Sequence, residues 1–427
     1  MAEESPPQKA TAAFDRRPPH QGAAAARATA AAVSEVSTTV ERMQRAVFAR
    51  VRRSSTAVST AVPAASPVGT TTAGIVDLLE ASAALTHSAV RLTGSAVAAG
   101  VGAGLRAKTP AGTLDESPRG AATLAGISAA FGDHLSSSTG TIALTTPMSV
   151  RNQGRTVPVT TAALRQSYPT AGTGVAVFVH GLAATELVWG EHYPAAVEPL
   201  TAVMLRFNTG VSVEANGVAL NQLLAALVDQ WPVPVERIVL IGHSMGGLVI
   251  RSGIAAGQAG EEAWLAELTD VVTLATPHRG APMEKVASTA IRALRLDAVA
   301  SPLADLFNRR SRGIKDLRFG AVHPDDWGGL DPDDVLHDTT SPHPLPAGVD
   351  HHGVVATLAA DPGGLSAHTL GDGLVRPASA AFTPGEVHRT LVHIPAAGHN
   401  RLLDHPDVAA LLHDVAVAGG NRTEQRP

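Results

Sequence analysis

The sequence of 427 residues contains no cysteine, so no disulfide bond supports the fold and no thiol takes part in chemistry. Aromatic residues are also scarce, at 3% of the chain, whereas apolar residues make up 44%, which is enough for a sizeable core. The length suits one large domain with an appendage, or two domains.

The sequence also lacks an excess of basic residues, a recognisable signal sequence and an apolar segment long enough to span a membrane. The formal net charge is −5, which leaves no electrostatic footprint for nucleic acid. Residues 1–22 are polar and proline-rich without an apolar h-region, and no uncharged apolar run reaches about 18 residues. We therefore expect no nucleic-acid partner and a cytoplasmic location.

The N-terminal part differs in texture from the rest of the chain. Residues 1–27 combine proline, charge and alanine with little to bury, which predicts a disordered tail. Residues 28–110 are rich in alanine, and apolar side chains at steps of three and four (Val33, Val36, Val40) predict a helical extension. Three roles stay open for it: packing on the catalytic unit, self-association with a second chain, or peripheral contact with a lipid surface.

Residues 136–420 are expected to form a catalytic domain, joined to the extension by a connector at 109–119 that contains proline and glycine. Strand-like runs alternate there with helical patterns such as 218–231, which predicts an α/β fold with a mostly parallel central sheet flanked by helices. A polar insertion at 282–350 is expected to form a lid. The predicted strands are 141–150, 155–160, 175–179, 202–207, 237–241, 271–274, 354–358 and 390–394.

The most informative stretch is RIVLIGHSMGGLVIRS, at residues 237–252. It predicts a buried strand, a tight turn and the start of a helix, and its turn fits the G-x-S-x-G nucleophile elbow. Gly242 and Gly246 remove side chains that would collide where strand and helix cross closely. Such a turn projects the Ser244 hydroxyl clear of both elements, so Ser244 is the candidate nucleophile.

A serine nucleophile needs a base, and the base needs an orienting acid. His399 follows Gly398 in a loop after the last predicted strand, from which an imidazole reaches back over the sheet edge to Ser244. Two aspartates, Asp361 and Asp372, follow the preceding strand. Asp372 is favoured because it lies between glycines that free the backbone.

An oxyanion hole needs backbone N–H donors on two sides of the reacting carbonyl oxygen. The predicted donors are the backbone N–H groups of Met245, directly after the nucleophile, and of Leu182, in the loop after the strand at 175–179. His180 and His243 are interpreted as structural residues that hold their loops. We expect them to bond and pack rather than to transfer protons.

Two adjacent histidines, His351 and His352, stand beside Asp350 and are candidate metal ligands. Neighbouring histidines in a polar insertion are expected to be solvated surface. We therefore predict neither a metal site nor a cofactor.

Taken in order, these motifs resemble the α/β-hydrolase superfamily, and within it the lipase/esterase branch that includes bacterial triacylglycerol lipases and inositol-deacylase-like proteins. The resemblance implies the α/β-hydrolase fold and hydrolysis of a hydrophobic carboxylic ester, a small molecule or a lipid, through an acyl-enzyme on Ser244. An acyltransferase or thioesterase with the same triad, docked on a lipid surface or a partner by its N-terminal helices, is the alternative. The stretches that carry the resemblance are VFVHGL (177–182), IGHSMGG (241–247), LATPHRG (274–280), GDGLV (371–375) and AGHNRLL (397–403).

Overall fold

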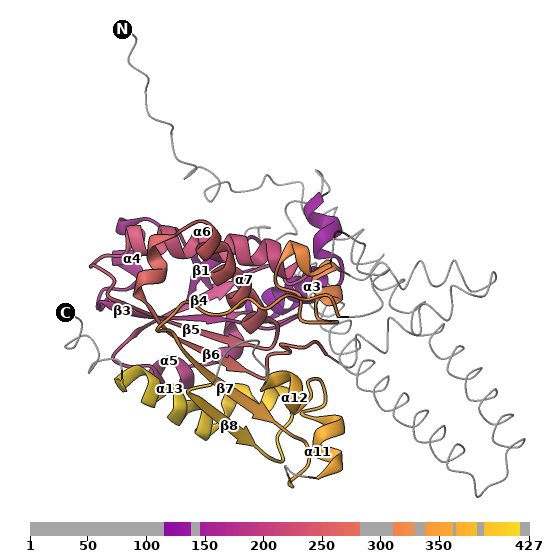
Figure 1. The fold of residues 1–427 in the computed structure, drawn as a ribbon. Helices are drawn as coiled ribbons and strands as arrows, with labels where there is room; N and C mark the ends of the chain where they lie inside the picture. Colours follow the sequence, from indigo (N-terminus) through magenta and orange to yellow (C-terminus); the bar gives the residue numbers. More distant parts are fainter. Residues whose placement is uncertain are drawn as a thin grey trace, which may run out of the picture.

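The computed structural model describes most of the predicted catalytic domain (Figure 1). The expected tail (1–27) and helical extension (28–110) lie outside the described residues, and their roles stay predictions. The described residues are 115–137, 146–281, 311–327, 329, 338–361, 364–381 and 388–418.

Strands and helices alternate along most of the described chain. In order, with η for a 3-10 helix, they are α3 (Pro118–Ser137), β1 (Ser149–Asn152), β2 (Arg155–Val157), α4 (Thr161–Ser167), β3 (Gly174–Val179), η4 (Glu186–Trp189), α5 (His192–Ala196), β4 (Thr201–Arg206), α6 (Val213–Gln230), β5 (Arg237–His243), α7 (Met245–Ala259), η5 (Ala263–Glu267), β6 (Leu268–Leu274), α10 (Arg312–Asp316), η6 (Pro324–Trp327), β7 (Asp350–Ala356), α11 (Leu365–Leu370), α12 (Pro377–Ala380), β8 (Thr390–Ile394), η7 (His399–Asp404) and α13 (Pro406–Ala418).

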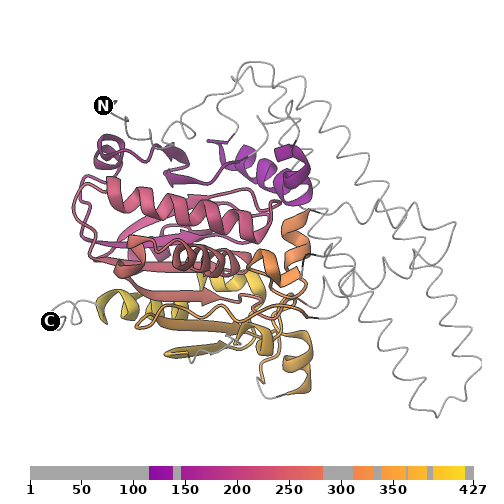
Figure 2. The same cartoon turned by 45° about the horizontal axis from the view of Figure 1, so that its top comes forward.

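The described strands form one sheet in the order β2-β1-β4-β3-β5-β6-β7-β8. Strands β3 to β8 run parallel, whereas β1 pairs antiparallel with β2 and with β4. Helices α6 and α7 cover one face, and α5 and α13 cover the other (Figures 1 and 2). The predicted mostly parallel sheet with helices on both faces is therefore confirmed.

The central strands are buried on both faces, which explains why they read as continuous apolar runs. In β3, Val175, Val177 and Val179 pack into the core beneath α6 and α7. The alternate residues Ala176 and Phe178 pack into the second core, beneath α5 and α13. The strand period of two thus divides one apolar segment between two cores.

Helix α3 was not predicted from the sequence. The expected connector at 109–119 runs into this helix at Pro118, and no element was expected for 120–135. Its buried side of small residues includes Ala121, Ala125 and Ala129, each four residues apart. A stripe of alanines carries a weak apolar signal, so periodicity alone gave little sign of a packed helix.

The predicted hairpin exists: β1 overlaps the expected strand 141–150, of which 141–145 lie outside the described residues, and β2 is shorter than the expected 155–160. Its turn is sharp because Gln153 and Gly154 have φ values of 48° and 77°. Strand β2 ends before Pro158, which lacks an N–H group for the sheet.

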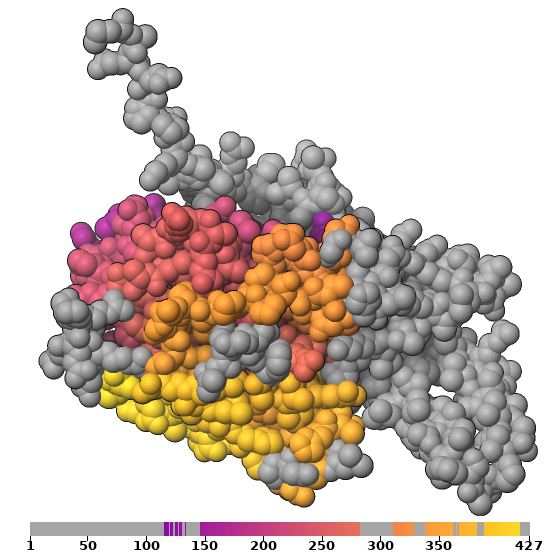
Figure 3. Space-filling view, in the orientation of Figure 1, coloured from indigo at the N-terminus to yellow at the C-terminus, as the bar shows by residue number. Residues whose placement is uncertain are grey.

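The described part of the insertion, residues 311–327 and 338–350, lies on the molecular surface. Figure 3 shows it in orange between the side formed by α6 and α7 and the C-terminal side of the chain. The helix expected near 286–296 lies outside the described residues. None of the helices that the structure describes has both the length and the apolarity to cross a membrane.

Candidate active site

The order of the strands reverses at β3, which makes the carboxyl ends of β3 and β5 a switch point of the sheet. Strand β3 pairs with β4 on one side and with β5 on the other, so the connections leaving β3 and β5 turn to opposite faces. Val179 and Gly242 are register partners at the carboxyl ends of these two strands. Sites in open parallel sheets form at such switch points, and the candidate nucleophile and oxyanion loop both begin here.

The turn after β5 has the strained geometry of a nucleophile elbow. Ser244 has φ 53° and ψ −122°, a conformation that side-chain-bearing residues rarely adopt. A Cβ atom on Gly246 would lie 2.1 Å from the Val179 carbonyl oxygen, and one on Gly242 would lie 2.6 Å from the Gly247 nitrogen. Glycine is therefore required at both positions for α7 to cross close to β3 and β5.

The candidate base and acid are hydrogen-bonded to each other. His399 Nδ1 lies 2.7 Å from Asp372 Oδ2, and both side chains are buried. The His399 backbone N–H also donates to the Asp372 carbonyl oxygen at 3.1 Å, so main chain and side chain fix the pair together. With Nδ1 donating to the carboxylate, Nε2 is left as the atom that accepts a proton.

The acid is held by a turn that its glycines make possible. Gly371 and Gly373 both have positive φ, at 57° and 97°. Asp372 Oδ1 accepts the backbone N–H groups of Leu374 and Val375 at 2.9 and 2.8 Å, which aims Oδ2 at His399. The other candidate acid, at position 361, is exposed.

His243 connects the nucleophile turn to the base loop. Its ring lies 4.8 Å from the His399 ring, and its Nε2 lies 3.3 Å from the His399 carbonyl oxygen, to which it donates. Burial lowers the pKa of His243 to about 3, so the ring stays neutral. Among the described residues, no hydrogen bond joins Ser244 to His399, and catalytic hydrogen bonds are often long or poorly aligned until substrate binds.

The loop after β3, which carries Leu182, passes close to the nucleophile turn, because a Cβ atom on Gly181 would lie 3.1 Å from Ser244 Cβ. His180 holds the start of this loop: Nδ1 donates to the Gly181 carbonyl oxygen at 2.9 Å, and Nε2 accepts the Phe207 N–H at 3.3 Å. Burial lowers the pKa of His180 to about 4, which keeps this neutral tautomer. Within the described residues, the Leu182 and Met245 amides have no hydrogen-bond acceptor. Their role as an oxyanion hole stays a prediction.

A comparison with known families finds one match. Residues 205–301 match the model of the PGAP1-like alpha/beta domain. This segment includes β5, the elbow and α7, and β5 lies at the centre of the sheet that the described strands form. The chain has the α/β-hydrolase fold. The fold that the resemblance implies is thus confirmed.

Solved structures with the α/β-hydrolase fold are similar to this chain at low identity. The mature Bacillus licheniformis lipase BlEst2 shares 18% identity with a TM-score of 0.37, over 56% of this chain and 91% of that chain. Aspergillus fumigatus lipase B shares 11%, with a TM-score of 0.37, over 61% and 58%. The Pyrobaculum calidifontis esterase shares 14%, with a TM-score of 0.33, over 58% and 77%. A comparison with curated proteins found no match. The reaction therefore has to be argued from the site.

The expectation that the paired histidines of the insertion are solvated was wrong. His351 and His352 belong to β7 and are buried. His351 Nε2 lies 2.9 Å from Thr273 Oγ1, and His352 Nε2 lies 3.2 Å from Asp270 Oδ1. They bond neighbouring strand side chains, and the described residues contain no cluster suited to a metal ion.

Tyr193 holds the loop that carries His399, a role that was not predicted from the sequence. The Tyr193 hydroxyl, on α5, donates to the Leu402 carbonyl oxygen and accepts the His405 N–H at 2.9 Å. These contacts hold η7, the short helix that begins at His399, against α5. More than 200 residues separate the partners in sequence, so no local pattern announces them.

Proposed function

We propose that this α/β-hydrolase-fold chain is a serine hydrolase of carboxylic esters, with Ser244 as nucleophile, His399 as base and Asp372 as orienting acid. The observation that carries the proposal is the buried 2.7 Å contact between His399 Nδ1 and Asp372 Oδ2 beside the strained elbow. A carboxylate in that place fixes the imidazole tautomer and stabilises the imidazolium that forms during catalysis.

Acylation begins when Ser244 Oγ attacks the ester carbonyl carbon while His399 Nε2 takes the hydroxyl proton. The carbonyl oxygen becomes an oxyanion, which accepts hydrogen bonds from the Leu182 and Met245 backbone N–H groups. Met245 begins α7, so the positive end of a helix dipole adds to the stabilisation. The intermediate then expels the alcohol, which receives its proton from His399, and leaves an acyl group on Ser244.

Deacylation repeats these steps with water in place of the serine hydroxyl. His399 removes a proton from water as the oxygen attacks the acyl carbon, and returns that proton to Ser244 Oγ when the carboxylic acid leaves. The same two amides stabilise the second oxyanion. We propose small-molecule or lipid esters with an apolar acyl group as the substrate class, following the resemblance to lipases and esterases.

The test is hydrolysis of p-nitrophenyl esters of increasing acyl length by the full chain and by Ser244→Ala. We expect activity to be lost in the variant, together with covalent labelling by a fluorophosphonate probe. Leu182 and Met245 contribute through main-chain atoms, so Ser244→Ala is the most direct substitution. A folded wild-type chain that neither hydrolyses any ester nor takes the label would refute the proposal.

A further inference from the structure

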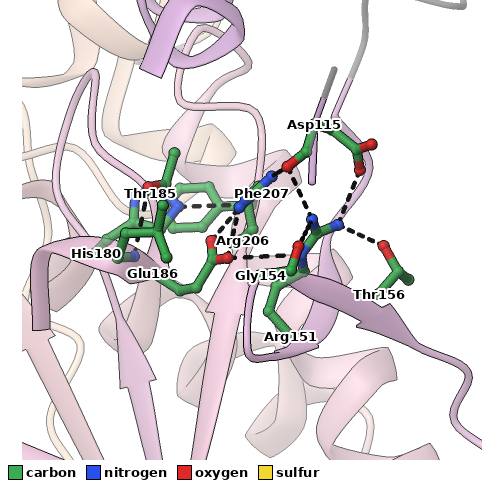
Figure 4. A network of polar contacts seen from close by, with 10 residues as sticks. Asp115, Arg151, Gly154, Thr156, His180, Thr185, Glu186, Arg206 and Phe207 are labelled. Atoms are coloured by element: carbon green, nitrogen blue, oxygen red, sulfur yellow. Dashed lines mark hydrogen bonds and ion pairs between the residues drawn. The ribbon is translucent and has the colours of Figure 1, made fainter. Parts of the chain in front are cut away.

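A buried ion pair lies directly behind the loop that carries Leu182. Arg206, the last residue of β4, donates from Nε to Glu186 Oε2 at 2.6 Å and from Nη2 to Glu186 Oε1 at 2.5 Å (Figure 4). The two side chains are 3% and 4% exposed. Paired donors on a planar guanidinium fix the direction as well as the distance of a carboxylate, so Glu186 is held rigidly.

The pair closes one end of the loop, and the neighbouring residues of the β4 end hold the rest. Phe207 stacks on the His180 ring at 4.3 Å between ring centroids and donates its N–H to that ring, where the loop begins. Thr209 Oγ1 accepts the Ala183 N–H at 3.2 Å, one residue after Leu182. Arg206 then holds Glu186, where the loop ends. The loop that carries Leu182 is therefore held on both sides of this residue by contacts with the end of β4 and the residues that follow it.

Two further residues complete the network on the side away from the loop. Arg151 on β1 lies 3.7 Å from Glu186 Oε1 and 3.1 Å from Asp115 Oδ2. Both arginines also donate to the Asp115 carbonyl oxygen (Figure 4). Two cations and two carboxylates balance in charge, so the buried pair is neutralised within the described residues.

We propose that Glu186 and Arg206 are positioning residues of the oxyanion hole, acting through the backbone of the loop that they close. An oxyanion donor works only within about 2.7–3.1 Å of the place where the charge develops. The elbow fixes the Met245 amide through α7, but Leu182 belongs to a loop and needs a separate anchor. This inference rests on the proposed function, because it assigns the pair to the transition state of that reaction.

The experiment compares Glu186→Gln and Arg206→Lys in the full chain with a matched pair elsewhere in the sheet. Arg237 and Asp270 form another buried ion pair, with Nη2 2.9 Å from Oδ2. Arg237 begins β5, roughly 20 Å along the strand from the elbow at about 3.3 Å per residue. Arg237→Lys and Asp270→Asn thus remove comparable interactions without touching the loop.

For Glu186→Gln and Arg206→Lys we expect kcat for p-nitrophenyl esters to fall about tenfold, with KM within twofold of wild type. Complete loss of one oxyanion donor costs about 10²–10³, and a displaced donor loses part of that. The inhibition constant of an alkyl trifluoromethyl ketone, which forms a tetrahedral oxyanion on serine, should rise in parallel with the loss of kcat/KM. The control pair should lower the melting temperature while leaving kcat and this inhibition constant unchanged.

Wild-type kcat in folded Glu186→Gln and Arg206→Lys would overturn the inference and leave the proposed function standing. So would an equal loss of kcat in the control pair, because it would mark a general effect of stability. An inactive and unlabelled wild type would instead remove the proposed function itself, which the Ser244→Ala comparison detects independently.

Discussion

Lowering the pH from 7.5 to 5 is expected to destabilise the fold through three histidines that are buried in the neutral form. Burial lowers the pKa of His180 to about 4 and that of His243 to about 3. Burial, helped by the nearby positive charge of Arg251, also lowers the pKa of His278 well below its usual value. In the unfolded chain each histidine titrates near its ordinary pKa of about 6.5.

The difference in proton binding between the folded and unfolded chains determines whether stability rises or falls with pH. Below pH about 6.5 the unfolded chain gains protons at these histidines and the folded chain does not, so stability is full above that pH and is lost as the pH falls towards the folded pKa values. At pH 5 His180 and His243 each remove about 2 kcal/mol from the free energy of unfolding, and His278 acts in the same direction. Asp316 acts in the opposite direction, because burial raises its pKa to about 6, and it returns about 1 kcal/mol. The net loss from His180, His243 and Asp316 is about 3 kcal/mol, and His278 adds to it; this is a large part of the typical stability of a domain.

The assay is urea unfolding followed by circular dichroism at pH 7.5 and at pH 5. His278→Gln removes one of the three buried histidines, the one that lies outside the proposed catalytic machinery, and should make the loss of stability between the two pH values smaller. His413→Gln is the matched control, because this side chain is exposed on α13. A stability that changes by less than about 1 kcal/mol between the two pH values, or a full pH dependence in His278→Gln, would refute the reasoning.

Two further predictions concern the triad and the elbow. Asp372→Asn should lower kcat about 10⁴-fold, because the wrong imidazole tautomer would be stabilised. Asp361→Asn should leave ester hydrolysis unchanged. Kinetics of both variants on one p-nitrophenyl ester shows which aspartate is the orienting acid. Gly246→Ala places a Cβ atom 2.1 Å from a main-chain oxygen of β3 and should lower the free energy of unfolding by at least about 1–3 kcal/mol. In Gly260→Ala the nearest atom to the new Cβ lies at 3.4 Å, so this control should melt at the wild-type temperature. Thermal melts of the two variants test the prediction.

The proposed triad residues could be located in the sequence because each lies at a point where backbone geometry restricts the residue type. The elbow needs small residues at two fixed positions around Ser244, and the sequence shows both. Asp372 could be distinguished from Asp361 because flanking glycines permit the positive φ values that its turn requires. Such steric requirements leave a local trace in the sequence, which is why the order of the strands and the candidate site residues could be predicted from it.

Long-range polar contacts leave no such trace. Glu186 and Arg206 are separated by 20 residues and would each pass for a solvated surface charge, yet they are buried against one another. His351 and His352 were expected to be solvated for the same reason, but their strand is buried and the neighbouring strand β6 supplies a hydrogen-bond partner to each. Pairing of buried polar groups depends on the register of the sheet, and register emerges only when the strands are assembled.

The proposed active site is built in two halves, and His243 is the contact that joins them. Ser244 and the two amides belong to the ends of β3 and β5, whereas Asp372 and His399 follow β7 and β8, with β6 between the halves. His243 packs on the base and donates to its carbonyl oxygen, so it transmits the position of the nucleophile turn to the base loop. A protonated neighbour would oppose the proton that His399 must accept. Because burial lowers the pKa of His243 to about 3, this contact stays neutral at every pH at which an imidazole base works.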